Sequence, residues 1–267
     1  MTERVVFADS WQRFFAESGL TSFDDFFGYS GSQRLENNKK RHVGILNLGN
    51  GRDCRVFFLK RFYFPHFKDM FFTLRNFGRL CSQAACEWKN ANLLLDKDVG
   101  TYRPVCYGEQ MYCRLEKKSF FVTEKLQSQC FMDFVAQNWW LLAQPQKEEI
   151  IIALAKLIRK VHNEAISLPD LYVWHIFIKE DKVADKWDFA FIDLHRMTQS
   201  VKSPNKKAKD LGRLYWSMSN KYFNDELKDL FLCTYMGNDW TGSKLALVRT
   251  IQKHTRVLAK RRKLKDY

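Results

Sequence analysis

The sequence predicts an α+β protein of two parts, a small antiparallel sheet in the first half of the chain and mostly helices in the second. Apolar runs separated by turn residues follow one another up to about residue 126, and the strand signals fade near residue 127. The clearest helical pattern in the chain comes after that point. We therefore expect a helical extension and loop at 1–40, a sheet-containing lobe at 41–127 and a helical lobe at 128–267.

The first residues predict two short helices and a loop. Phe residues cluster on both sides of Gly19 between Trp11 and Phe27, which favours two short helices separated by that glycine. The following stretch, 28–41, is polar and typical of a loop.

A hairpin is predicted next. The apolar runs Val43–Leu48 and Cys54–Arg61 flank Gly49-Asn50-Gly51. Because Asn-Gly tolerates the positive φ that tight turns require, we expect the two runs to pair as antiparallel strands.

A helical pattern from about Phe71 to Leu95 includes a carboxylate on its apolar side. Positions on one stripe recur at offsets of three and four: Leu80, Ala84, Glu87, Ala91 and Leu94. A carboxylate is costly to bury without a partner. We therefore expect Glu87 to pair with a cation from elsewhere in the chain.

After a turn at Arg103-Pro104, the sequence predicts two or three more strands before residue 127. Lys117-Lys118-Ser119 is the expected turn within this stretch, ahead of the apolar run Phe120–Val122.

In the second half, the stripes of apolar residues predict a helix over Gln144–Asn163. Short strands are expected at Leu171–Lys179 and Trp187–Leu194, on either side of a charged turn. The chain from Lys206 onward is predicted to be mostly helical.

The net charge of +14 favours an anionic partner, such as nucleic acid, an acidic membrane surface or a phosphorylated glycolipid. Part of the excess lies near the end of the chain: Lys253, Arg256, Lys260, Arg261, Arg262, Lys263 and Lys265. Next to an anionic membrane each such side chain adds about 1 kcal/mol of attraction. The sequence has no zinc-finger spacing or RNA-recognition signature, so no specific nucleic acid is expected.

The seven cysteines are scattered without a C-x-x-C pair, so we expect reduced and mostly buried thiols, with no zinc ribbon and no disulfide framework. No apolar run reaches 18 residues, and the first residues carry early charges without a long apolar region. The expected compartment is the cytosol.

Three polar residues are predicted to meet around one hairpin. Asp170 follows the long helix, His175 opens the next apolar run five residues later, and Asp193 ends the run after that. Their side chains carry metal-binding or proton-accepting chemistry, and the hairpin topology favours their convergence at one of its ends.

The first half supplies the cation that Glu87 needs. Lys60 ends the apolar strand VFFLK. A Lys60–Glu87 pair would satisfy both groups, and protein kinases use such a pair to hold the α- and β-phosphates.

These motifs together resemble the lipopolysaccharide kinase family of Kdo/WaaP-type core sugar kinases, which have a protein-kinase-like bilobal fold. The similarity includes a histidine five positions after the catalytic aspartate and D-L-H where protein kinases have D-F-G, and it runs roughly from Trp11 to Trp216. The motifs follow in kinase order: VFFLK (Lys60), AACEWKNANLL (Glu87), FFVTEKL (Glu124), LIRKVH (His162), DLYVWH (Asp170, His175), FIDLH (Asp193) and KDLGRLYW (Asp210).

The resemblance implies an ATP-dependent kinase for a heptose or Kdo hydroxyl of the lipopolysaccharide inner core. Asp170 would accept or orient the proton of the attacking hydroxyl, and Asp193 would bind the Mg²⁺ that bridges the β- and γ-phosphates. His175 stands at the position for a second metal. Because Mg²⁺ prefers oxygen, His175 has three alternatives: it hydrogen-bonds Asp170 or a phosphate, it favours Mn²⁺, or it only packs under the loop.

The resemblance also assigns the nucleotide site. Lys60, positioned by Glu87, would hold the α- and β-phosphates, and Glu124 to Leu126 would form the hinge that meets the adenine. His162 and Asp210 would brace the catalytic loop. The enzyme would work at the cytoplasmic face of the bacterial inner membrane, on the lipopolysaccharide core and lipid A glycolipid, in peripheral contact with anionic lipid.

Two departures from the pattern keep other functions open. Leu168 and Pro169 stand before the catalytic aspartate, where kinases usually have His, Arg or Gly, and the predicted hairpin offers only Gly49 and Gly51 as a glycine loop. One alternative is a kinase-fold enzyme that acts on a protein or small molecule. The other is a non-catalytic pseudokinase or basic binding module.

Overall fold

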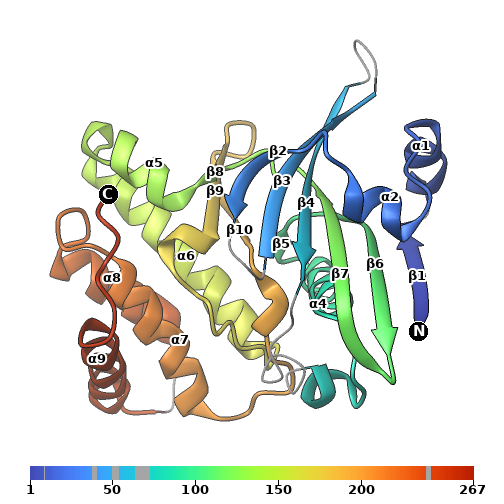
Figure 1. The fold of residues 1–267 in the computed structure, drawn as a ribbon. Helices are drawn as coiled ribbons and strands as arrows, with labels where there is room; N and C mark the ends of the chain where they lie inside the picture. Colours follow the sequence, from blue (N-terminus) through green and yellow to red (C-terminus); the bar gives the residue numbers. More distant parts are fainter. Residues whose placement is uncertain (9, 38–40, 50–53, 64–72, 239–241) are drawn as a thin grey trace. The chain divides into compact units, whose positions relative to one another are not determined.

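The computed structural model describes residues 1–8, 10–37, 41–49, 54–63, 73–238 and 242–267, without the side chains of 34–37. The chain forms two compact units, Met1–Leu126 and Gln127–Tyr267. Figure 1 shows the sheet of the first unit and the helices of the second. Each unit is described by itself.

The first unit is built on a six-stranded antiparallel sheet with the order β1-β6-β7-β4-β3-β2. The predicted hairpin strands are confirmed as β3 and β4, which pair from Arg41 with Phe62 to Leu48 with Arg55. Its turn at Asn50-Gly51 lies outside the described residues. The strands are β1 (Thr2–Phe7), β2 (Gln33–Asn37), β3 (Arg41–Leu48), β4 (Arg55–Phe62), β6 (Pro104–Tyr112) and β7 (Leu115–Glu124).

The two short N-terminal helices are confirmed as α1 (Trp11–Glu17) and α2 (Phe23–Gly28). The chain between them turns at Gly19, whose φ is +74°. Their aromatic side chains form the core over one face of the sheet, where Phe26 stacks on Phe120 of β7 with ring centroids 4.7 Å apart. Aromatic side chains bury a large apolar area each, so this cluster contributes strongly to the core of the unit.

Helix α4 (Gln83–Asp96) packs against β6 and β7. Ser82 caps it by accepting the Ala85 N–H, and Ala84, Glu87 and Leu94 are buried on its sheet side. The predicted stripe therefore holds within the helix, and β5 (Gly100–Thr101) follows it.

Three local predictions for this unit are wrong. The stretch 28–41 is not all loop, because β2 pairs with the edge of β3 through backbone groups. The helix predicted over 71–95 is interrupted between 77 and 83, where Gly78 has a φ of +64° and Ser82 starts a new helix; residues 71 and 72 lie outside the described residues.

The third error concerns the turn between β6 and β7, which lies at Cys113-Arg114, with φ of 47° and 63°, and not at Lys117–Ser119. The register shifts so that Lys117 is an extra residue opposite Gln110 and Met111. This bulge exposes two successive lysines within a strand, and the polar pair is what suggested a turn.

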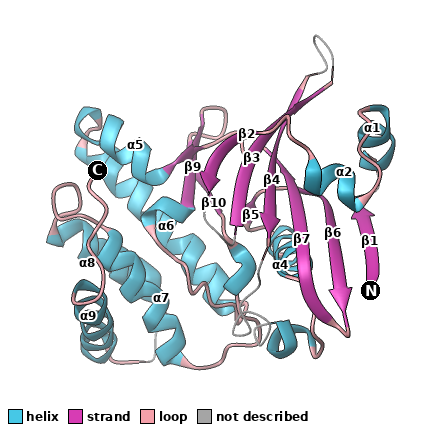
Figure 2. Ribbon diagram, viewed as in Figure 1, coloured by secondary structure: helices cyan, strands magenta, loops and turns pink. Residues whose placement is uncertain are grey.

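The second unit is mainly helical, as Figure 2 shows. The predicted helix Gln144–Asn163 is confirmed as α6, which packs against α8, while α7 packs against α9. Its elements are β8 (Gln129–Cys130), α5 (Phe131–Asn138), α6 (Gln144–Asn163), β9 (Ile176–Asp181), β10 (Lys186–Phe191), α7 (Pro204–Ser217), α8 (Asp225–Met236) and α9 (Lys244–Ala259), with 3₁₀ turns at Trp139–Leu141, Val173–His175 and Leu194–Arg196.

The predicted hairpin of the second unit is confirmed as β9 and β10, but its strands are shorter than expected. Residues 171–175 form turns, since the Tyr172 N–H bonds the Asp170 carbonyl and the His175 N–H bonds the Tyr172 carbonyl. Ser217 also binds the Val173 N–H at 3.0 Å. A side chain from α7 thus takes a hydrogen bond that a strand would have used.

All seven cysteines are free, as predicted, but the expectation that most are buried is wrong. Cys81, Cys86 and Cys106 are buried, and burial raises the pKa of each thiol. Cys113, in the turn after β6, is one of three exposed cysteines, the others being Cys54 and Cys233.

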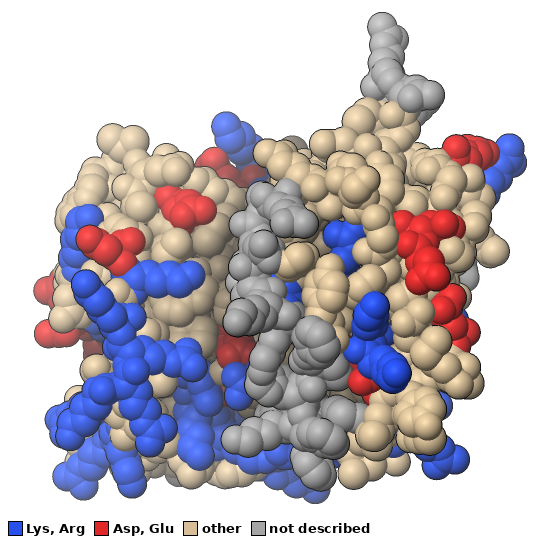
Figure 3. Space-filling view, in the orientation of Figure 1, with Lys and Arg blue, Asp and Glu red and all other residues tan. Residues whose placement is uncertain are grey.

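Lys and Arg side chains gather over α9 and its neighbours, as Figure 3 shows. Four of them line an open groove: Arg249, Lys253 and Arg256 of α9, and Lys260 directly after it. None of the helices in the described ranges combines the length and apolar character that crossing a membrane requires.

Candidate functional site

The loop between α6 and β9 presents the carboxylate of Asp170. One oxygen, Oδ1, accepts a hydrogen bond from Arg196 Nη1 at 3.1 Å. The other oxygen, Oδ2, is buried and has no hydrogen-bond partner among the described residues. Because a buried carboxylate oxygen normally has a donor, this atom is an acceptor for which the described residues supply no donor.

Buried side chains hold this loop despite Leu168-Pro169. Asp210 Oδ2 accepts the Leu168 N–H at 2.9 Å, and Asp210 is 1% exposed. His162 Nε2 lies 3.5 Å from the same oxygen, and its Nδ1 is 2.7 Å from the Tyr235 hydroxyl. The loop is therefore braced from α6, α7 and α8 through the backbone N–H of Leu168, and not through the side chains of Leu168 and Pro169.

His175 connects Asp170 to Asp193. Its Nδ1 lies 2.8 Å from the Asp170 carbonyl oxygen, which can only accept, so Nδ1 carries the hydrogen. In the neutral ring Nε2 then has a lone pair, and it lies 3.9 Å from Asp193 Oδ2. Two acceptors that face each other at this distance suit a cation or a proton between them.

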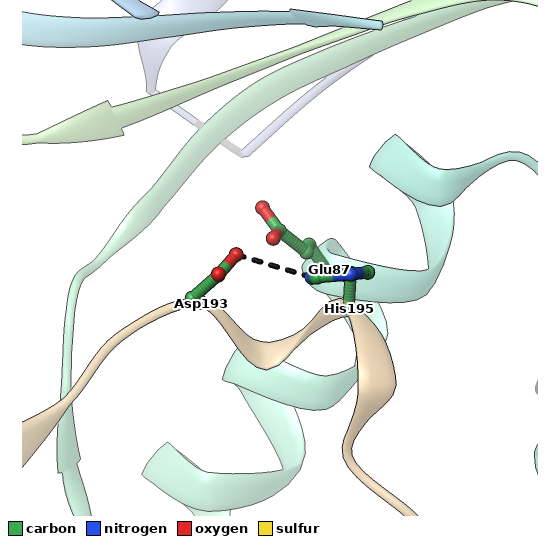
Figure 4. Close-up of side chains that lie close together, drawn as sticks. All are labelled: Glu87, Asp193 and His195. Atoms are coloured by element: carbon green, nitrogen blue, oxygen red, sulfur yellow. Dashed lines mark hydrogen bonds and ion pairs between the residues drawn. The ribbon is translucent and has the colours of Figure 1, made fainter. Parts of the chain in front are cut away.

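Asp193 follows β10 in a left-handed backbone conformation, with φ 61° and ψ 58°. This conformation is uncommon for a residue other than glycine and costs of the order of 1 kcal/mol. In this conformation the carboxylate faces two imidazoles: Oδ2 lies near His175 Nε2, and Oδ1 lies 3.1 Å from His195 Nδ1, the contact dashed in Figure 4. The predicted meeting of Asp170, His175 and Asp193 at one end of the hairpin is confirmed.

This donor set fits a divalent cation. Asp170, His175 and Asp193 line one pocket of the second unit, with Leu168, Ile192 and Met197 among its apolar walls. Carboxylate oxygens suit Mg²⁺, and imidazole nitrogen suits Mn²⁺ better than Mg²⁺. Asp193 is the residue that would hold the ion, with His175 Nε2 as a second donor.

In the first unit, Lys60 of β4 and Glu87 of α4 form an ion pair, so the predicted pairing is confirmed. The Glu87 side chain is 1% exposed and that of Lys60 is 14% exposed. A buried carboxylate requires such a partner. Figure 4 shows Glu87 on its helix.

The segment predicted as a hinge is fixed by backbone hydrogen bonds. Glu124 ends β7, and its N–H bonds the Arg103 carbonyl at 3.0 Å. The Lys125 N–H bonds the Val56 carbonyl at 3.1 Å, and Leu126 is half-buried. The backbone of this segment is thus held on both sides by the first unit.

Sequence reasoning assigned no role to Arg196 or His195. Both directly follow the D-L motif of Asp193, and this proximity is the signal that could have indicated them. Arg196 and Asp170 are 26 positions apart, on either side of the β9–β10 hairpin, so the contact has no local sequence signal.

The fold and these sites define a protein-kinase-like class: a small antiparallel sheet with a Lys–Glu pair, and a helical unit with an aspartate loop and a second aspartate after a hairpin. A solved structure described as WaaP in complex with acyl carrier protein has the same fold, with a TM-score of 0.71 and 23% identity over 96% of this chain and 99% of that one.

The model of the lipopolysaccharide kinase (Kdo/WaaP) family matches residues 32–235, and the chain belongs to this family. A lipopolysaccharide core heptose(I) kinase WaaP from Pseudomonas aeruginosa is 30% identical over 154 residues, which is 56% of this chain and 58% of the relative. The protein of the same description from Escherichia coli K12 is 29% identical over 140 residues, or 50% and 52%. The chain thus spans a little over half the length of these relatives in the matched regions.

Proposed function

We propose that this chain is an ATP-dependent kinase that phosphorylates a sugar hydroxyl of the lipopolysaccharide inner core. The observation that carries the proposal is the grouping of Asp170, His175 and Asp193 at one end of the β9–β10 hairpin, with a buried Asp170 oxygen left as an acceptor. Membership of the lipopolysaccharide kinase family supports the substrate class.

In this mechanism the acceptor hydroxyl donates its hydrogen bond to Asp170 Oδ2, which orients the hydroxyl oxygen and accepts its proton as the phosphoryl group is transferred. Arg196 holds Oδ1 and so fixes the plane of the carboxylate. Asp193 and His175 would hold the divalent ion, which supplies charge neutralisation at the transferred phosphate when bound. Positioning and neutralisation are the main requirements of this reaction.

The first unit takes the nucleotide-binding role and the second the catalytic role in this proposal. Lys60 would neutralise the α- and β-phosphates of ATP, since the ion pair with Glu87 fixes the direction of its ammonium group. The backbone of Glu124 to Leu126 would meet the adenine. The extension at 1–40 would complete the core of the sheet through its helices α1 and α2.

Heptose is the sugar that we propose, ahead of Kdo, because the P. aeruginosa and E. coli K12 relatives are both described as heptose(I) kinases. Phosphate transfer to heptose requires that the acceptor oligosaccharide contain heptose, whereas transfer to Kdo does not. Core oligosaccharide with and without the heptose therefore separates them.

We also propose that the chain works in the cytoplasm, peripherally at the inner face of the inner membrane. The basic groove along α9 supports this location, since its four cations attract an anionic lipid or glycolipid surface. The solved relative is described in complex with acyl carrier protein, and we propose such a protein as a partner of this chain.

The test is transfer of label from γ-labelled ATP, with deacylated core oligosaccharide and generic protein substrates tried side by side. Wild type and the control Asp188→Asn, an exposed carboxylate on the same hairpin, should label the oligosaccharide. Asp170→Asn should not. Labelling of protein alone would favour the protein-kinase alternative, and no labelling at all would favour the binding module.

A further inference from the structure

The last residues of the chain lie on aromatic side chains of the catalytic loop. Arg262 Nη1 donates to the Tyr172 hydroxyl at 3.2 Å, and its guanidinium lies 6.0 Å from the Tyr172 ring centroid. Lys265 Nζ lies 4.6 Å from the Trp174 ring centroid. These are cation–π contacts at distances where the attraction is effective.

The two rings connect these cations to the proposed catalytic groups. Tyr172 and Trp174 stack in parallel, with centroids 4.8 Å apart and planes 7° apart. Both meet the His175 ring edge-on, at 5.9 and 6.2 Å. The Tyr172 N–H and His175 Nδ1 in turn both bond the Asp170 carbonyl oxygen. A shift of the ring pair would therefore move His175 and Asp170 together.

Tyr267 fixes the far end of the segment. Its hydroxyl donates to the Ser217 carbonyl at 2.7 Å and accepts the Ser219 N–H at 3.0 Å, and its ring stacks on Tyr222. Burial raises the pKa of this hydroxyl to about 12, so it keeps its proton at neutral pH. Ser217 is also the residue whose side chain binds the loop at Val173.

We infer that Arg262–Tyr267, which we name the C-terminal strap, positions the loop that carries Asp170 and His175 for the reaction. Arg262 and Lys265 are positioning residues that act through Tyr172 and Trp174. The inference rests on the proposed kinase function for its effect on rate. Its effect on the loop is independent of that function.

The experiment compares variants of the full chain by initial rates with ATP and deacylated core oligosaccharide, and by hydrogen exchange of the backbone amides at 170–175 without nucleotide. Arg262→Ala and Lys265→Ala should each lower kcat about fivefold, the factor of one cation–π contact, and leave the KM for ATP unchanged. Both should speed amide exchange at 170–175. Lys265→Arg keeps the cation over the ring and should restore both values.

The matched control is Lys263→Ala, which removes the same charge from an exposed position of the strap. Lys263→Ala should match the wild type in kcat and in amide exchange. If Lys265→Ala differs from Lys263→Ala in neither quantity, the inference is overturned. In a Trp174→Leu background Lys265→Ala should have no further effect. A full effect there would show that Lys265 acts by another route and would also overturn it.

The two readouts separate this inference from the proposed function. If the wild-type chain transfers no phosphate, the kinase proposal fails. Hydrogen exchange of the amides at 170–175 then still shows whether the C-terminal strap positions the loop.

Discussion

The carboxylate of Asp210 holds the backbone of Leu168: its Oδ2 accepts the Leu168 N–H at 2.9 Å, two residues before Asp170. Asp210 lies on α7, and its other oxygen bonds Arg213 Nη1 at 3.1 Å. The contact links the helical core of the second unit directly to the loop that carries the proposed proton acceptor.

Asp210→Ala should therefore lower the free energy of unfolding by about 1–3 kcal/mol, because it leaves the buried Leu168 N–H without its acceptor. Urea denaturation measures the change. The exposed Asp188→Ala, which removes only a surface ion pair, should cost less than about 1 kcal/mol. Equal losses in the two variants would contradict a bracing role for Asp210.

Lys60→Met should destabilise the protein by roughly 3 kcal/mol, since the Glu87 carboxylate stays buried without its main countercharge. The double variant Lys60→Met/Glu87→Gln should recover most of this loss, because it removes the buried charge as well. Thermal or urea unfolding checks both. Arg13→Met, from the exposed Arg13–Glu17 pair, is the control and should change little. A double variant no more stable than Lys60→Met would refute the account of this pair.

Arg196→Ala should lower kcat by one to two orders of magnitude, roughly, because the Asp170 carboxylate loses the donor that fixes its orientation. Arg196→Lys keeps the charge but not the planar geometry, so its kcat should lie between those of Arg196→Ala and the wild type. The KM for ATP should stay the same in both. Wild-type kcat in Arg196→Ala would remove Arg196 from the mechanism.

Asp25 should make the stability of α2 depend on pH in the acid range. The Ser22 and Thr21 N–H groups, which bond its Oδ2 at 2.7 and 3.0 Å, lower the pKa of this carboxyl to about 2. The lowered pKa means that the stabilisation is present at neutral pH and is lost as pH falls from about 4 to about 2.

The Tm difference between wild type and Asp25→Ala should therefore be constant near neutral pH and shrink through that window. Asp24→Ala, which removes a carboxylate from the same first turn of the helix, is the control. A Tm difference for Asp25→Ala that is unchanged at pH 2 would contradict this assignment.

Elements whose signal lies in neighbouring residues could be predicted from the sequence. Helix α6 follows from its own apolar stripes, and the pairing of β3 with β4 follows from alternating runs around one turn. Strand β2 could not be predicted in this way, because its backbone pairs with a strand edge while its composition is that of a loop. Backbone pairing leaves little trace in residue type.

In the candidate site, too, some contacts could be predicted from the sequence and others could not. The Lys60–Glu87 pair could be predicted because a buried carboxylate demands a cation. The site at the β9–β10 hairpin could be predicted because its residues flank two short strands. The contact of Arg262 with Tyr172 joins residues 90 positions apart, and an exposed arginine near the end of a chain gives no local sign of its partner. The roles of the site residues remain predictions.

Mass spectrometry of the lipopolysaccharide core from a strain that lacks this gene tests the proposed kinase function in the cell. We expect a core without one phosphate group, restored by the wild-type gene and by Asp188→Asn but not by Asp170→Asn. A core with unchanged phosphorylation in the deletion strain, or full restoration by Asp170→Asn, would contradict it.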